Sequence, residues 1–100
     1  MAMSDEKVII LAEVPVKPEH LEEVKSLCAE TLKPTLQESG CEAFYQNFKK
    51  DDPNTLVFFE IFSSKEALDL HMNKEYTKTF FENIKDKLSG KPVSVILGEL

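Results

Sequence analysis

Residues 56–62 of the chain read Leu-Val-Phe-Phe-Glu-Ile-Phe. Aromatic and β-branched residues dominate this run, which is typical of a β-strand. Successive side chains of a strand point to opposite faces of a sheet. One face therefore carries Leu56, Phe58 and Phe62, and the other carries Val57, Phe59 and Ile61. Because both faces are apolar, this strand is expected to be covered on both sides.

Three further strands are expected. Residues 42–49 alternate between two faces, and the turn formers at 51–54 join them to the first run as a hairpin over Glu42–Phe62. Residues 7–14 are rich in β-branched residues and stop at Pro15, and residues 93–97 form the last strand.

In the two remaining segments, apolar residues recur at the spacing of an α-helix. The first helix begins at Pro18, is kinked or interrupted at Pro34, and closes at Gly40, which is expected to be a left-handed cap. Ser63 and Glu66 have the spacing of a capping box and begin a short helix over residues 67–72. A second helical stretch follows and ends at residues 89–90.

The element order is therefore β-α-β-β-α-β, a ferredoxin-like α+β fold with a four-stranded antiparallel sheet. We expect a single domain over residues 1–100, with residues 1–6 frayed. Helices can cover only one face of this sheet, and the uncovered apolar face would exceed what a monomer usually exposes. The sequence thus predicts a homodimer that forms through the sheet face.

The composition of the chain argues against two classes of binding partner. The chain of 100 residues has a formal net charge of −6. This charge argues against a nucleic-acid or anionic-membrane partner, and no apolar run is long enough to cross a bilayer. Cys28 and Cys41 cannot make a disulfide framework, and nothing before Lys7 resembles a signal peptide. We expect a cytoplasmic location.

No nucleotide, metal or acyl-enzyme motif occurs, so we expect no bound cofactor and no metal site. His71 is a candidate general base, because histidine titrates closest to physiological pH; the alternative is a half-buried structural histidine. Glu60 lies inside an apolar strand, where a carboxylate is costly to bury. It either holds a neighbouring base or a substrate hydroxyl, or is a structural buried acid.

Three more side chains are candidates for ligand contacts. Tyr45 and Asn47 share a strand face and offer polar ends, with the edge of the core as the alternative. Tyr76 belongs to a helical stripe of aromatic residues and is the member expected to reach a ligand.

The run from Glu60 to His71, E-x-(aromatic)-x-S-x-E-A-x-x-x-H, together with E-x-G-C at Glu38–Cys41, resembles the antibiotic biosynthesis monooxygenase family. The resemblance covers nearly the whole chain. It implies a dimeric α/β barrel with a pocket in each subunit between sheet and helices. It also implies cofactor-free oxidation of a small phenolic or quinol-type substrate by O2.

Carried onto this chain, the resemblance makes His71 the base or proton shuttle, and Glu60 the group that orients His71 or the substrate. Tyr45 and Asn47 would hydrogen-bond the phenolate oxygens, and the walls would be Phe58, Phe62 and Tyr76.

The chain also departs from its relatives. Many carry Trp where this chain has Phe62, and the haem-degrading ones use a Trp and a later His that are absent here. One alternative is a cofactor-free isomerase or lyase for a small carbonyl compound or a phosphosugar signal, although the chain has no Arg to anchor a phosphate. Another alternative is a non-catalytic dimeric ligand-binding module.

Overall fold

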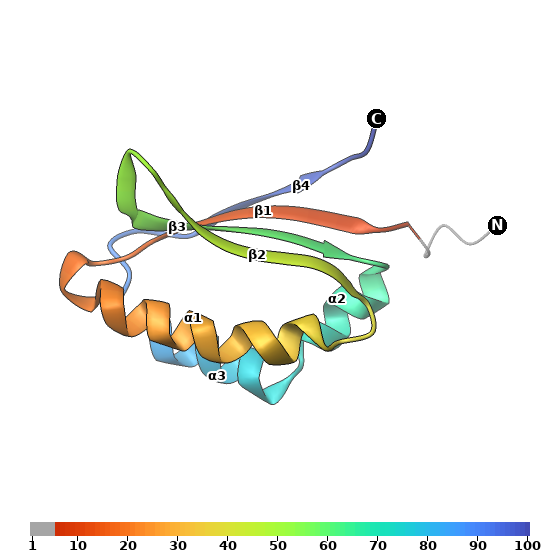
Figure 1. The fold of residues 1–100 in the computed structure, drawn as a ribbon, viewed down its shortest axis with the longest axis horizontal. Helices are drawn as coiled ribbons and strands as arrows, with labels where there is room; N and C mark the ends of the chain where they lie inside the picture. Colours follow the sequence, from red (N-terminus) through yellow and green to blue (C-terminus); the bar gives the residue numbers. More distant parts are fainter. Residues whose placement is uncertain (1–5) are drawn as a thin grey trace.

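The computed structural model describes residues 6–100 and confirms the α+β ferredoxin-like topology (Figure 1). The strands are β1 (Val8–Pro15), β2 (Cys41–Lys49), β3 (Asp52–Phe62) and β4 (Val93–Leu97). The helices are the 3-10 turn η2 (Pro18–His20), α1 (Leu21–Leu36), α2 (Lys65–Met72) and α3 (Glu75–Ile84). The expected fraying at the start of the chain falls on residues 1–5, which lie outside the described residues, and on Glu6, which is exposed.

The sheet is antiparallel with the order β2-β3-β1-β4. Strand β3 therefore lies in its interior, with Glu60 opposite Ile10 of β1 and opposite Phe44 of β2. This register places the even-numbered residues of β3 on the face toward the helices. The odd-numbered residues point to the other face.

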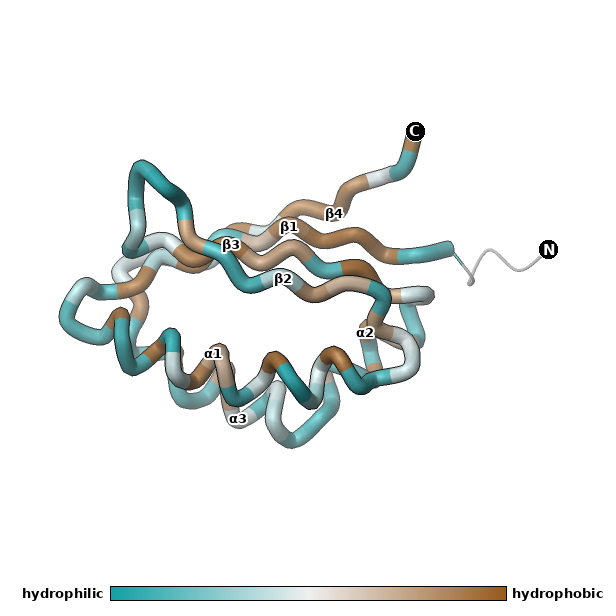
Figure 2. Tube along the Cα trace, in the orientation of Figure 1, coloured by the Kyte–Doolittle hydropathy of each residue, from teal (hydrophilic) through white to brown (hydrophobic). Residues whose placement is uncertain are grey.

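All the helices lie on one side of the sheet (Figure 1), and the sheet strands form a largely apolar layer above them (Figure 2). The core lies between the sheet and the helices. Its buried members include Val14, Val24, Leu56, Phe58 and Ile84. No helix among residues 6–100 has both the length and the apolar character that a membrane span requires.

The helix boundaries correct several expectations. Helix α1 continues through Pro34 to Leu36 without interruption. Ser64, and not Ser63, caps α2, because its side chain accepts a hydrogen bond from the Ala67 N–H. Gly40 is not left-handed, since no glycine among the described residues has positive φ. Its small size serves a close approach to α2 instead.

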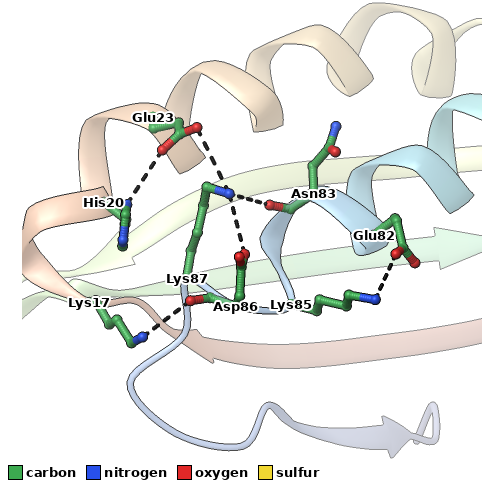
Figure 3. A network of polar contacts seen from close by, with 8 residues as sticks. All are labelled: Lys17, His20, Glu23, Glu82, Asn83, Lys85, Asp86 and Lys87. Atoms are coloured by element: carbon green, nitrogen blue, oxygen red, sulfur yellow. Dashed lines mark hydrogen bonds and ion pairs between the residues drawn. The ribbon is translucent and has the colours of Figure 1, made fainter.

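The second helical stretch ends at Ile84, earlier than its apolar stripe suggested. The segment that follows is held instead by the end of β1: Val16 forms a bridge with Leu88, Lys17 N–H donates to Lys87 O at 2.9 Å, and Ser89 N–H donates to Pro15 O at 3.1 Å. Figure 3 shows the polar contacts that surround this junction, where Lys87 reaches Asn83 O at 2.8 Å.

Candidate active site

A cavity of about 740 Å³ lies between the helix-facing side of the sheet and the helices. This volume is within the range of small-molecule sites. Most of its lining is apolar and comes from β1, β3, α3 and the segment after α3; examples are Ile10, Ala12, Phe58, Phe80 and Leu88. The polar exceptions include Glu60, His71, Thr35 and Thr77. The junction between the end of β1 and the segment after α3 thus also holds a wall of the cavity, because it fixes the segment that carries Leu88.

His71 reaches the cavity from the last turn of α2 and is bound from behind by Glu38, which follows α1. His71 Nδ1 lies 2.9 Å from Glu38 Oε2, and the two side chains are only 8% and 9% exposed. The Tyr76 hydroxyl, from the first turn of α3, donates to the same carboxylate oxygen. The Glu38 Oε2 atom, from the turn between α1 and β2, therefore binds one side chain of α2 and one of α3.

The environment of the His71 ring is aromatic. Its centroid lies 4.9 Å from that of Phe62 and 5.9 Å from that of Phe44. A carboxylate can only accept hydrogen bonds, so Nδ1 carries the hydrogen that points at Glu38. In the neutral ring Nε2 is then an acceptor. Within residues 6–100 this nitrogen has no hydrogen-bond partner, and His71 lines the cavity.

Glu60 enters the same cavity from β3. Burial raises the pKa of its carboxyl to about 7, and no hydrogen bond or opposite charge among the described residues offsets this effect. A carboxyl with this pKa exchanges protons near neutral pH, as an acid or base catalyst must. Besides the exposed Lys85, the lining of the cavity thus contains two titratable groups, Glu60 on the sheet and His71 on a helix.

Two buried hydroxyls stand out in the helix layer. Thr35 Oγ1 in α1 and Thr77 Oγ1 in α3 are the only buried side-chain polar atoms within residues 6–100 without a hydrogen-bond partner. A buried hydroxyl without a partner is costly. Both residues belong to the walls of the cavity.

The structure brings together only some of the residues that the sequence singled out. His71, Glu60 and Phe58 line the cavity. Phe62 is fully buried and packs on the His71 ring, so it supports the site from behind. Tyr76 binds Glu38, which differs from the expected role as a cavity wall.

Tyr45 and Asn47 lie on the opposite face of the sheet. Tyr45 is 61% exposed and its ring packs 6.4 Å from that of Phe59, while Asn47 donates to the Val57 carbonyl at 3.3 Å. Neither side chain contacts His71 or Glu38, because the odd-numbered residues of β2 point away from the helices.

Glu38 is the functional residue that reasoning from the sequence missed. The expected partner of His71 was Glu60, yet the carboxylate that holds the ring comes from 33 positions upstream. The only signal was the position of Glu38 in the E-x-G-C run. Within residues 6–100 no three His, Cys, Asp or Glu side chains are grouped as metal ligands.

Comparison with known proteins agrees with this architecture. A protein of Synechocystis sp., sll1783, is 31% identical over 94 residues, which are 92% of this chain; the chain spans 62% of that relative's length. A solved structure of a conserved protein from Methanosarcina mazei is 26% identical, covers 94% of this chain and 93% of its own, and has a TM-score of 0.87.

A solved structure from Nitrosomonas europaea, which bears the name antibiotic biosynthesis monooxygenase, superposes with a TM-score of 0.90. The alignment covers 100% of this chain and 96% of that one, and its 19% identity shows the fold alone. The family pattern described as Antibiotic biosynthesis monooxygenase matches residues 7–83. The chain therefore belongs to the antibiotic biosynthesis monooxygenase family.

Proposed function

We propose that the chain is a cofactor-independent monooxygenase that oxidises a small phenolic or quinol-type compound with O2. The observation that carries the proposal is the His71 ring, which Glu38 holds at 2.9 Å while its other nitrogen has no hydrogen-bond partner at the apolar cavity. Such a ring is suited to remove a proton from a bound hydroxyl. The family to which the chain belongs supports the same reaction class.

The chemistry begins with the substrate hydroxyl. His71 Nε2 takes the phenolic proton, and the buried Glu38 carboxylate stabilises the imidazolium that forms. The phenolate then gives electrons to O2. For a hydroquinone, the substrate and O2 yield a hydroxyquinone and water: one oxygen atom enters the ring and the other leaves as water. The substrate supplies all four electrons, so no external reductant is needed.

Glu60 is the second acid–base group in this proposal. Its carboxyl, with a pKa of about 7, can donate a hydrogen bond to a substrate oxygen or accept one near neutral pH. Phe58 and other apolar side chains of the cavity keep water away from the anion. Phosphorylated substrates fit less well. The lysine that lines the cavity, Lys85, is exposed, and its charge is already paired with Glu82 at 2.6 Å.

We also propose that a second copy of the chain covers the outer face of the sheet. On this face Tyr45 and Val95 are 61% and 47% exposed. Phe59 and Ile61 of β3 lie among them and are only half-buried. A continuous apolar layer of this kind marks an interface. An identical sheet is the natural cover, and it leaves each cavity on the far side from the contact.

The function is tested by oxygen uptake with a panel of hydroquinones and phenols. His71→Asn keeps a hydrogen-bond donor for Glu38 but has no base, so we expect kcat to fall roughly 100-fold or more. His71→Ala is the second variant, and His20→Ala, on the surface, is the control. The absence of oxygen uptake with every compound would contradict the proposal. Turnover of a carbonyl compound without oxygen would instead identify an isomerase or lyase.

A further inference from the structure

The carboxylate of Glu38 is shared between a histidine and a tyrosine. His71 Nδ1 and the Tyr76 hydroxyl both bind its Oε2 atom, and the Glu38 side chain is 9% exposed. Neither Glu38 nor Tyr76 lines the cavity, whereas His71 does. Glu38 and Tyr76 can therefore affect a bound molecule only through their contacts with His71.

We infer that Glu38 and Tyr76 are positioning residues of the site: Glu38 holds His71 in the tautomer that presents Nε2 to the cavity, and Tyr76 holds Glu38. The inference rests on the proposed function for the use made of His71. A neutral imidazole carries one N–H, and its place is decided by the partner of each nitrogen. Because Glu38 only accepts, the N–H is at Nδ1, and the lone pair at Nε2 is free to take a proton.

Tyr76 acts as a permanent donor in this arrangement. Burial, and then the nearby Glu38 carboxylate, raise the pKa of the Tyr76 phenol to about 12, so the phenol keeps its proton throughout the physiological range. The Thr35 hydroxyl lies beside the phenol and opposes that rise, but its geometry falls short of a hydrogen bond. With the phenol fixed, the carboxylate cannot rotate away from His71 without losing a charge-assisted bond.

The arrangement also fixes the ring plane. Phe62 and Phe44 pack on His71 at centroid distances of 4.9 and 5.9 Å, and Glu38 anchors its edge. The ring is therefore held both by packing and by a hydrogen bond. A residue that acts only on stability would not need to select one tautomer, and this difference makes the inference testable.

The test is a 15N NMR measurement of the imidazole tautomers at a pH where the rings are neutral. The chain has two histidines, so the spectrum is simple, and His20 on the surface is the internal reference. In the wild type we expect His71 to be in the Nδ1–H form. In Glu38→Gln the amide can donate as well as accept, so the Nε2–H form should become populated. A wild-type His71 in the Nε2–H form, or an unchanged ring in Glu38→Gln, would overturn the inference.

Kinetics provide the second readout. Glu38→Gln should lower kcat roughly 10- to 100-fold and Tyr76→Phe roughly 3- to 10-fold, both with KM within about twofold of wild type, since neither residue touches the substrate. The matched control is Glu42→Gln, whose side chain is exposed and paired with Lys7. Thermal denaturation checks that each variant is folded.

The two proposals fail separately. If the wild type takes up no oxygen, the proposed oxidation is wrong, while the tautomer of His71 still decides this inference. If the wild type is active and both variants lose stability with kcat and tautomer unchanged, Glu38 and Tyr76 are structural residues and the inference is wrong.

Discussion

Gly40 lies directly against Ala67: a Cβ at position 40 would be 2.4 Å from the Cβ of Ala67 and 3.3 Å from Ser63 Oγ. Gly40 O also accepts a hydrogen bond from Ser63 N–H at 2.8 Å. The connection after α1 is thus pressed onto the start of α2, and the two segments carry Glu38 and His71. The absence of a side chain at position 40 lets the carboxylate and the imidazole meet.

We therefore expect Gly40→Ala to lower the free energy of unfolding by about 1–3 kcal/mol, because α2 must shift to relieve the overlap. Chemical denaturation measures this loss. Gly98→Ala is the control, since nothing lies within 4 Å of a Cβ there. Equal stability of Gly40→Ala and wild type would show that the backbone absorbs the methyl group without cost.

Glu60 should make stability depend on pH. Its carboxyl has a pKa of about 7 in the folded chain and its ordinary value of 4.5 when unfolded. Between these values the unfolded chain has lost the proton that the folded chain keeps. The contribution of Glu60 to the free energy of unfolding is therefore fully present below pH 4.5. It falls as the pH rises toward 7, by at most about 3 kcal/mol.

Urea denaturation of wild type and Glu60→Gln at pH 5 and pH 8 checks this expectation. Because the amide cannot ionise, the free energy of unfolding of the variant should increase relative to that of the wild type as the pH rises. Glu42→Gln, at an exposed carboxylate, should follow the wild-type profile. A constant difference between Glu60→Gln and wild type at both pH values would contradict the raised pKa.

Thr77→Val should stabilise the chain by about 1 kcal/mol. The Thr77 hydroxyl is buried without a hydrogen-bond partner, and valine keeps the shape while it removes the polar atom. Thermal denaturation measures the effect. Thr55→Val is the opposite control, because Thr55 Oγ1 donates to Asp52 Oδ2 at 2.6 Å and its loss should destabilise. A less stable Thr77→Val protein would show that the hydroxyl has a partner in solution.

Val95→Lys should separate the two copies of the proposed dimer. Val95 is 47% exposed on the outer face of β4, so a lysine there is tolerated by one chain but places charges in the contact between two. Sedimentation at micromolar concentration should give twice the chain mass for wild type and the single mass for the variant. Leu70→Lys, at a leucine of α2 that is 66% exposed, should remain a dimer. A wild-type monomer would contradict the proposed interface.

The fold could be predicted because alternation and helical spacing are local properties of the sequence. The apolar run at residues 56–62 lies within β3, and β1 ends at Pro15, one residue beyond the end expected from pattern alone. The end of α3 could not be predicted, because Leu88 continues the helical stripe, whereas in the structure it forms a bridge with Val16 outside the helix. That contact joins residues distant in sequence.

The site was predictable in part for the same reason. His71 and Glu60 stand out as polar residues in apolar surroundings, and both line the cavity. Glu38 gives no such signal, since its role depends on the turn that brings it back to α2. The face on which Tyr45 lies could not be predicted, because both faces of its strand carry candidate side chains and the choice depends on which face the helices cover.

Strand β3 contributes to both sides of the sheet, with Phe58 and Glu60 toward the cavity and Phe59 and Ile61 toward the outer face. Because the faces alternate residue by residue, exchanges at even positions can alter the lining of the cavity while the odd positions of the outer face, where the dimer contact is proposed, stay unchanged. Insertion of a single residue would exchange the two sets along the rest of the strand. A replacement within β3 therefore changes one face of the sheet only, whereas a change in the length of the strand alters both faces at once.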